Sequence, residues 1–332
     1  MTGTELIVDT ARPSLLTTGP SLPTRELVAE SLGLRVGHAE GTLPLSLNEV
    51  LLGRPEGSTA KAGRVRPFLA GGARFWWLGP AETGSTALDA AVGLDGHRVG
   101  WPSRAVEAGV VHALELIAAR PWAMALVTTY VTTFALATRP DGEKGQITSC
   151  SLPDFPLCVF LSPRAFVHIP PLSVSRTESA RLAAENIYHE AVHQSVNHSL
   201  LTRDLLAPSY SSATSPKIPI YWRSGAGNAA RNREWELDRV LHAAAVYCHL
   251  LRWRHAELTD PTSGVEHRSF VARAAAESIG ALTTLCDALV EHIGHFTPEG
   301  ALTVGRIVEA SNNRGALLRL TLDSLETGLL EV

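Results

Sequence analysis

Two histidines and a glutamate lie at a spacing that suits a metal ion, because His189, Glu190 and His193 form an HExxH sequence. If this segment is helical, residues four apart share one face, about one turn or roughly 6 Å from each other along the axis. Both imidazoles could then bind one metal ion, and the glutamate could act as an acid or a base beside it. The alternative is that these are ordinary polar positions on a helix.

The sequence around the motif favours a long amphipathic helix over residues 177–204. No Pro or Gly interrupts this run, and Thr177, Glu178 and Ser179 form a typical helix start with an early carboxylate. Apolar residues next to the histidines would pack this helix against a core: Leu182, Ala183, Ile187, Ala191 and Val192. The context therefore favours a metal site at His189 and His193.

A third ligand must come from elsewhere, and its identity decides which chemistry the site could perform. A metzincin would have Gly three positions and His six positions after the second histidine. Those positions hold Val196 and Ser199, and His198 falls one residue short. The motif is therefore not of that class.

One candidate for the third ligand is Glu234, in a strong helix predicted from about Glu234 to Leu258. This arrangement would be a His/His/Glu zinc site of the gluzincin type. Asp238 would then orient His189, and Glu190 would be the general base for a zinc-bound water. The alternative for this charged run is an exposed first helical turn, which the helix dipole favours.

The other candidate is His242, on the same predicted helix. His242, Val246 and His249 share one face, so His242 could point toward a metal held by another helix. The alanines 243–245 would let the two helices approach closely. A lone histidine among Leu, Val and Ala is more often a buried core residue with its own hydrogen bonds, so this alternative also stays open.

A small sheet is predicted directly before the HExxH helix. The β-branched and aromatic run Val127–Leu136 indicates a strand, and Gln146–Cys150 and Leu157–Leu161 indicate two more. A sheet edge beside an HExxH helix is the usual arrangement in zincin-type metallopeptidases, where an extended peptide pairs with the edge strand. By analogy, a peptide is the expected substrate.

The remaining elements define an α+β fold that is mainly helical, with a small sheet beside the HExxH helix and a helical C-terminal half. We expect residues 1–120 to form a mostly helical N-terminal region packed on a catalytic region, residues 121–332. Further helices are predicted at Thr24–Leu32, Ser46–Leu52, Ser103–Arg120, Phe270–His292, Leu302–Glu309 and Leu317–Leu325, and a further strand at Arg74–Leu78.

Composition limits the partners and the location of the protein. The 332 residues are 45% hydrophobic with a net charge of −4, which predicts a soluble globular protein with a large core. We find no basic stripe, no secretory signal and no apolar run long enough to span a membrane. We therefore expect a cytoplasmic protein without a nucleic-acid or membrane partner. The widely spaced Cys150, Cys158, Cys248 and Cys286 are expected to be reduced thiols.

Residues 145–255 resemble the HExxH-type peptide-modification family. The likeness combines the strand Leu157–Ser162, the motif His189–Gln194, the segment Tyr221–Arg223 and the helical segment Leu241–Tyr247. Members of this family are understood as iron(II)- and 2-oxoglutarate-dependent oxygenases that hydroxylate the β-carbon of a side chain in ribosomally made precursor peptides. The resemblance implies the cofactors Fe(II) and 2-oxoglutarate, with O₂ and a precursor peptide as partners.

The resemblance also implies roles for single residues. His189, His193 and His242 would be the iron ligands, and Arg223 would bind the C5 carboxylate of 2-oxoglutarate. Glu190 would be either a ligand or a group beside the metal. Tyr221 stands where the family pattern has a proline. The alternatives are a zinc metallopeptidase of the gluzincin type and a metal-stabilised scaffold without catalytic activity, which would have a closed four-ligand site.

Overall fold

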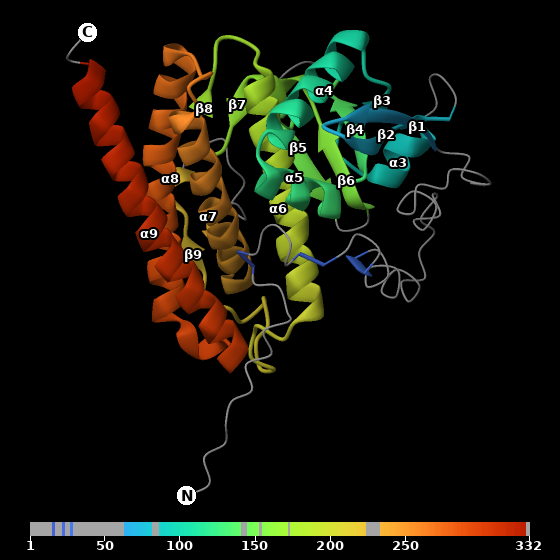
Figure 1. The fold of residues 1–332 in the computed structure, drawn as a ribbon. Helices are drawn as coiled ribbons and strands as arrows, with labels where there is room; N and C mark the ends of the chain where they lie inside the picture. Colours follow the sequence, from blue (N-terminus) through green and yellow to red (C-terminus); the bar gives the residue numbers. More distant parts are fainter. Residues whose placement is uncertain are drawn as a thin grey trace, which may run out of the picture.

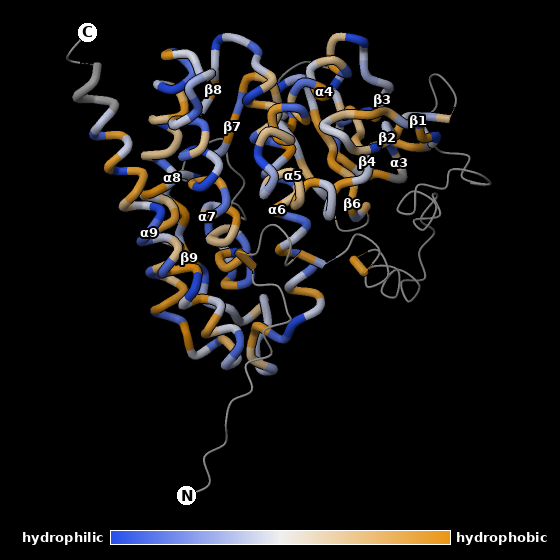
Figure 2. The backbone as a smooth tube through the Cα atoms, in the orientation of Figure 1, coloured by the Kyte–Doolittle hydropathy of each residue, from blue (hydrophilic) through white to orange (hydrophobic). Residues whose placement is uncertain are grey.

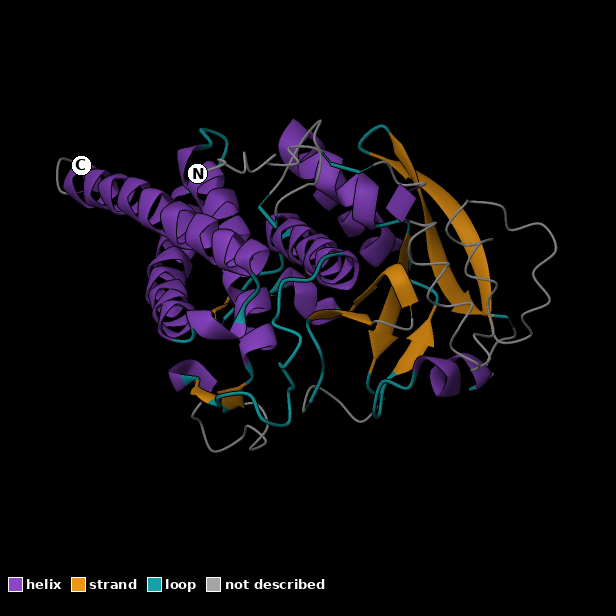
Figure 3. Cartoon of the chain, turned by 90° about the horizontal axis from the view of Figure 1, so that it is seen from below, coloured by secondary structure: helices purple, strands orange, loops and turns teal. Residues whose placement is uncertain are grey.

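The computed structural model describes residues 15–16, 22–23, 27–28, 63–81, 86–140, 145–152, 155–171, 173–223 and 233–329. A mixed sheet lies on one side of the molecule and a group of long helices on the other, which confirms the predicted α+β class (Figures 1 and 3). The helix predicted at 46–52 lies outside the described residues. So does the helix predicted at 24–32, apart from Leu27 and Val28, which are helical.

The sheet has six strands in the order β1-β2-β4-β6-β5, and β3 pairs with β4. Its strands are β1 Gly63–Ala70, β2 Ala73–Pro80, β3 Arg98–Gly100, β4 Thr133–Thr138, β5 Ser149–Leu152 and β6 Phe155–Leu161. The pairs β2/β4 and β4/β6 are parallel, and the others are antiparallel. Gly71 and Gly72 both have positive φ, which the tight turn between β1 and β2 requires. Because β5 is the last strand in the order β1-β2-β4-β6-β5, it lies at one edge of the sheet.

The helices are α3 Ala87–Val92, α4 Arg104–Ala118, α5 Pro121–Tyr130, α6 Ala180–Thr202, α7 Leu237–Thr259, α8 Val265–Glu291 and α9 Pro298–Leu329. Short elements complete the described chain: the 3₁₀ turns η1 Pro163–Phe166, η2 Tyr221–Arg223 and η4 Ile293–His295, and the paired strands β7 His168–Ile169 with β8 Ser173–Val174 and β9 Ile218–Pro219 with β10 Glu234–Trp235. The HExxH helix begins at Ala180, three residues later than predicted, and the side chain of Ser179 caps it by accepting a hydrogen bond from the backbone N–H of Arg181.

The strand predicted over residues 127–136 is wrong in its first half. Residues 121–130 form α5, and only the segment from Thr133 onward is the strand β4. Pro121 stands at the start of α5, where its fixed φ suits a helix, and Thr128 bonds back to the carbonyl of Met124. Two of the three β-branched residues of this helix, Val127 and Thr129, are buried, so packing outweighs their strand propensity.

Two further expectations need correction. The helices predicted at 302–309 and 317–325 are parts of one helix, α9. The expected boundary at residue 120 does not separate a helical region from the sheet, because β1, β2 and β3 precede it and form one sheet with the strands that follow. The regions 1–120 and 121–332 therefore share a sheet.

The HExxH helix α6 is the centre of the described structure. It contacts β5 and β6 on one side and α7 on another, and α4 and α5 also pack on it. Figure 1 shows α6 between the sheet and the helices α7, α8 and α9. The buried strands β4 and β6 are largely hydrophobic (Figure 2). Burial on several sides fixes the position of α6 relative to β5 and α7.

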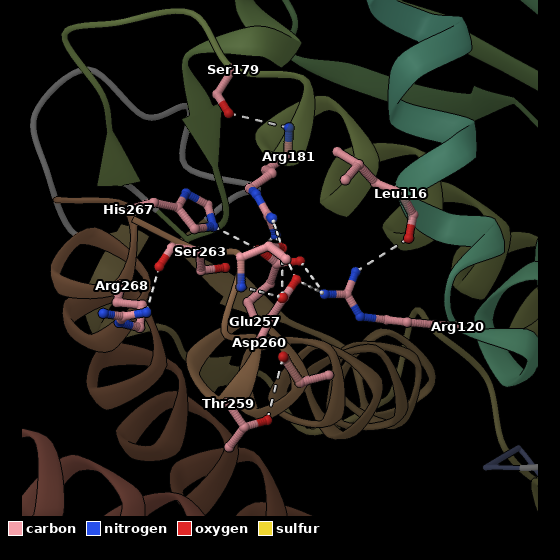
Figure 4. A network of polar contacts seen from close by, with 12 residues as sticks. Leu116, Arg120, Ser179, Arg181, Glu257, Thr259, Asp260, Ser263, His267 and Arg268 are labelled. Carbon is pink, nitrogen blue, oxygen red and sulfur yellow. Dashed lines mark hydrogen bonds and ion pairs between the residues drawn. The ribbon is translucent and has the colours of Figure 1, made fainter. Parts of the chain in front are cut away.

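A buried carboxylate, Glu257, ties four helical segments together. Arg120 Nη2 lies 2.6 Å from Glu257 Oε1, while Arg181 Nη1 and His267 Nε2 lie 3.1 Å and 2.7 Å from Oε2. Asp260 joins the same network through Arg181 at 3.0 Å. Figure 4 shows Glu257 between Arg120 on one side and His267 on the other. The network joins the start of α5 and the start of α6 to α7 and α8.

Both carboxyl groups of this network are more acidic than usual. Burial alone would raise the pKa of Glu257, but the hydrogen bond from His267 and the charges of Arg120 and Arg181 lower it below its ordinary value. Burial likewise opposes ionisation of Asp260, but hydrogen bonds from Thr262 and Arg181 lower its pKa to about 2. A carboxyl group whose pKa is lower in the folded protein than in the unfolded chain stabilises the fold at pH values above its unfolded pKa, which is about 4. This contribution to stability is lost as the pH falls through the pKa that the group has in the folded protein.

We expect Glu257→Gln to lower the free energy of unfolding at pH 7 by about 3 kcal/mol, because it leaves two arginines without their buried partner. Chemical denaturation across pH 2–7 measures this. The stability of the wild-type protein should fall from about pH 4 downward, and the variant should lose less over that interval. The exposed Glu266→Gln, in the first turn of α8, is the matched control. Equal stability of both variants at pH 7 would contradict the role of the network.

Candidate functional site

Three imidazoles meet where α7 crosses α6. The Nε2 atoms of His189 and His193 lie 2.5 Å apart, and Nδ1 of His193 lies 2.5 Å from Nε2 of His242. The ring centroids are separated by 4.4 Å and 4.7 Å. The structure therefore brings together two residues of the HExxH motif and one residue that is 49 positions later in the chain.

A buried ion pair joins the two helices, and small residues follow His242 on α7. The alanines 243–245 of α7 offer little bulk, and Ala244 and Ala245 are buried. Arg254 of α7 is also buried, and its Nε lies 3.0 Å from Oε1 of Glu185, one turn before His189 on α6. Arg254 also donates to the carbonyl of Pro170 and to that of Ala274 on α8. This residue links the position of α7 to α6, to α8 and to the segment before β8.

The arrangement with Glu234 as third ligand is not formed. Glu234 lies in β10, where it pairs with Pro219, and its side chain is exposed. The helix begins only at Leu237, after this strand. Asp238 does not orient His189, since its carboxylate accepts hydrogen bonds from Tyr210 at 2.9 Å and from Ser212 at 3.3 Å. Because β10 pairs with β9, the charged run that begins at Glu234 lies away from the histidines.

A cavity of about 650 Å³ opens beside the histidines. Its wall is formed by the segment 146–151, η1, β7, α6, η2 and α7. All five residues expected to form the site line it: His189, Glu190, His193, Arg223 and His242. Other lining residues were missed by the sequence analysis: Arg164, His168, Asn186 and Tyr247. Arg164 follows closely on the fully buried strand β6, and a charged residue at the end of such a strand is a signal that could have identified it.

Glu190 connects the HExxH helix to the edge strand. Glu190 is 4% exposed, and its carboxylate accepts a hydrogen bond of 2.7 Å from the hydroxyl of Ser149 in β5. Burial raises the pKa of Glu190 to about 7, and hydrogen bonds from Ser149 and Ser151 act in the opposite direction. A carboxyl group with this pKa can both accept and donate a proton near neutral pH.

The three histidines are neutral at pH 7. Burial lowers the pKa of His189 to about 3 and that of His242 to about 4, and burial together with the two neighbouring rings holds the pKa of His193 well below its ordinary value. Neutral imidazole is the form that binds a metal ion. Three such donors suit iron(II) or zinc by ligand type.

The rings are closer together than ligands of one ion can be. Two nitrogens that each lie about 2.1 Å from a metal at a right angle are about 3 Å apart, so His189 and His193 would have to separate by roughly half an ångström. His193 faces its neighbours through different nitrogens, so one ring must also turn for all three to share an ion. Among the described residues, no group of three or more His, Cys, Asp or Glu has the geometry of a finished metal site. The donor types fit a metal ion, whereas the positions of the rings would have to change before all three could bind one.

Two buried polar atoms on α6 support this fit. In the described part of the chain, neither Nδ1 of His189 nor Oδ1 of Asn186 has a hydrogen-bond partner. The two residues are three apart on one helix, so they share one face of it. Metal-bound histidines usually donate their second N–H to such an oxygen. If the ring of His189 rotated so that Nε2 faced a metal, its Nδ1–H could donate to Oδ1 of Asn186. Both of these buried atoms would then have a hydrogen-bond partner.

A scan against protein-family models finds no match to this sequence, and a search of curated proteins finds none that is significantly similar. The resemblance to the HExxH-type peptide-modification family therefore stays a prediction from motifs. No helix in the described ranges is both long and apolar enough to span a membrane. The four cysteines are free thiols, and Cys150 lies on the cavity wall.

We expect His242→Ala to weaken binding of Co(II), used as a spectroscopic substitute for iron, by more than the 10- to 100-fold that changes beside a ligand typically cause. His242 should supply a direct ligand, so its loss removes a bond to the ion. Titration followed by visible absorption measures the affinity. His255→Ala, on the same helix but outside the cavity, is the control. Unchanged Co(II) affinity in His242→Ala would remove this residue from the site.

Proposed function

We propose that this protein is an iron(II)- and 2-oxoglutarate-dependent oxygenase that hydroxylates the β-carbon of a side chain in a precursor peptide. One observation carries the proposal: a third imidazole, His242, reaches the HExxH histidines in a cavity that is also lined by arginines. A gluzincin would use a carboxylate in this position, and Glu234 lies elsewhere.

His189, His193 and His242 would hold the iron. With 2-oxoglutarate and O₂, iron(II) supplies the oxidant that converts a C–H bond to C–OH, while 2-oxoglutarate becomes succinate and CO₂. Three histidine ligands would leave further positions of the ion open to substrates, whereas a scaffold site would be closed by a fourth protein ligand. The adjoining cavity supports the open type of site.

Arg223 would bind the C5 carboxylate of 2-oxoglutarate. It lines the cavity from η2, and its charge acts on Tyr247 and His168, two other residues of the wall. Trp222, the preceding residue, packs between Trp235 and Tyr247 with ring centroids 5.9 Å and 6.1 Å away. This packing fixes the backbone from which Arg223 extends. A guanidinium group can bind a carboxylate through two parallel hydrogen bonds.

The edge strand β5 would orient the peptide. Six consecutive residues, 146–151, line the cavity. The carbonyl of Thr148 accepts a hydrogen bond from the N–H of Ser162, and Cys150 is opposite Phe160, so the backbone groups of Ser149 turn toward the free edge. An extended peptide could pair there as an added strand. A cavity of about 650 Å³ has room for 2-oxoglutarate and for one side chain of that peptide.

The other residues of the cavity would keep the reaction away from bulk water. Val246, Tyr247 and Leu250 present the apolar side of α7 to the cavity. Glu190 would hold or release a proton at its carboxylate beside β5. Its hydrogen bond from Ser149 also ties the metal-binding helix to the strand that would bind the peptide. The chain would thus position both substrates relative to one ion.

A zinc metallopeptidase is the second candidate, and the position of Glu190 favours it. A buried carboxyl group between an HExxH helix and an edge strand is where a general base would activate water against a bound peptide. In this protein such an enzyme would have to use His242 as its third ligand, because Glu234 is exposed on β10. Both candidates predict a peptide substrate.

We expect anaerobically prepared, iron(II)-loaded protein to form succinate from 2-oxoglutarate once O₂ is admitted. His242→Ala should abolish this activity, and Arg223→Gln should raise the KM for 2-oxoglutarate by at least tenfold, since one charge-assisted pair contributes about 1.5–3 kcal/mol. Succinate is quantified by mass spectrometry after the iron content of each sample has been measured. His255→Ala controls for effects of substitution in α7.

Iron-loaded protein that forms no succinate with or without a peptide would contradict the oxygenase. If the protein instead binds zinc tightly and cleaves peptides in a manner that depends on Glu190, the metallopeptidase is the function.

We expect Asn186→Ala to weaken Co(II) binding by about 10- to 100-fold, because His189 loses the oxygen that would orient its ring. The same change removes hydrogen bonds from Asn186 Nδ2 to the carbonyls of Ala165 and His168, so stability has to be measured in parallel by thermal unfolding. Ser162→Ala removes a different buried hydrogen bond of the same wall and is the control. If both variants weaken Co(II) binding equally, the role of Asn186 is only structural.

A further inference from the structure

The residue directly after the HExxH motif, Gln194, binds the backbone of the sheet. Its Oε1 accepts a hydrogen bond from the N–H of Leu157, and its Nε2 donates to the carbonyl of Cys158 at 3.2 Å. Both partners lie in β6, and Gln194 itself is buried. A side-chain amide that uses its oxygen and its nitrogen on neighbouring peptide groups is held in one position and one orientation. The helix α6 is therefore attached to the sheet at this residue.

Leu157, the donor to Gln194, has an unusual backbone conformation. Its φ is 59°, in the left-handed region that bulky residues rarely adopt, and its side chain is fully buried. Its carbonyl accepts a hydrogen bond of 2.9 Å from the N–H of Thr132, directly before β4, while its own N–H is directed to α6. Such conformations persist only where the surrounding structure holds them, and they are concentrated at functional sites. Gln194 is part of what holds this one.

The pairing of β5 with β6 is irregular in the same part of the sheet. Its register shifts between Cys150 and Leu152. Irregularities of this kind bend a strand and redirect its side chains, and they are frequent beside active sites. Ser149 and Ser151, on either side of Cys150, both bind the carboxylate of Glu190. The part of β5 that meets the HExxH glutamate is thus the part where its pairing with β6 changes.

The helix α6 presents two different faces at this junction. Glu190 and Gln194 are four residues apart and share the face toward the sheet, where Glu190 meets β5 and Gln194 meets β6. His189 and His193 each precede one of them and line the cavity. Because successive residues of a helix are offset by a fixed rotation of about 100°, fixing Gln194 against β6 also fixes the direction in which His193 leaves the helix.

We propose that Gln194 is a positioning residue of the site. Through its two hydrogen bonds to β6 it fixes the rotation of α6 against the sheet, and thereby the place of His193 among the imidazoles and of Glu190 at β5. This inference rests on the proposed function in treating His193 as a metal ligand, whereas the attachment of α6 depends only on the contacts of Gln194. Gln194 itself contacts neither the metal nor the peptide.

The test uses Gln194→Met in the full chain, because methionine has a similar length and removes both hydrogen bonds. In the metal-free protein we expect the backbone amides of β5 and of α6 around His193 to exchange hydrogen faster, as measured by mass spectrometry. In the Co(II)-loaded protein we expect the visible d–d bands of the metal to change and the affinity for Co(II) to fall at least tenfold, as is typical when a group that orients a ligand is lost.

Gln146→Met is the matched control. The amide of Gln146 is also bonded to the backbone of the sheet, since its Nε2 donates to the carbonyl of Ala137 at 3.0 Å and its Oε1 accepts from the N–H of Arg139 at 2.8 Å. These bonds join β4 to the segment before β5 and do not involve α6. We expect a similar loss of thermal stability in both variants, but the Co(II) spectrum and affinity should change only in Gln194→Met.

Several outcomes would overturn the positioning role. These are an unchanged Co(II) spectrum and affinity in Gln194→Met, an equal change in Gln146→Met, or unchanged hydrogen exchange in β5 and α6. A wild-type protein that binds no Co(II) would overturn it together with the metal site. The inference and the proposed function can also fail separately. Metal binding that depends on Gln194 without iron-dependent succinate formation would support the positioning role and contradict the oxygenase. Succinate formation that Gln194→Met leaves unchanged would do the reverse.

Discussion

The close packing of α6 against α7 is the constraint on which the site depends. An HExxH helix alone supplies two imidazoles, and the third comes from a helix that must approach within side-chain contact. The alanines of α7 permit this approach, and the buried pair of Arg254 and Glu185 fixes it one turn from His189. A buried ion pair is costly to break because the remaining charge stays in a medium of low polarity. The same pair therefore links the stability of the helical half to the geometry of the histidines.

A second constraint joins this helical half to the sheet. Glu190 follows His189 directly, and its carboxylate is held by Ser149 of the edge strand β5. Movement of α6 relative to the sheet would therefore shift the positions of the histidines and of the edge of β5 together. The cavity lies at this junction, with cationic side chains from η1 and η2 on its wall. A metal site, an anion site and a peptide-binding edge would thus share one cavity.

The sequence predicted the elements whose signals are local. The long run without Pro or Gly around His189 and the cap at Ser179 define α6 within a few residues, and the buried run 157–161 lies within β6. The first half of the run 127–136 was wrongly predicted as a strand, because the β-branched residues of α5 are enclosed by neighbouring elements. Local propensity cannot reveal such packing.

The site could be predicted only in part for a related reason. The spacing of His189 and His193 is a property of one helix, whereas the choice between Glu234 and His242 depends on where α7 begins and how it crosses α6. The pairing of β9 with β10 decides this choice, and it involves strands of only two residues each. Arg164 and His168 were missed because they reach the cavity from short elements after β6, which carry no motif.

X-ray absorption spectroscopy of the iron(II)-loaded protein reports how many imidazoles bind the metal. We expect an iron with three imidazole nitrogens and exchangeable oxygen ligands, and one imidazole fewer in His242→Ala. An iron with only two imidazoles in the wild-type protein, or one closed by further protein ligands, would rule out the three-histidine site.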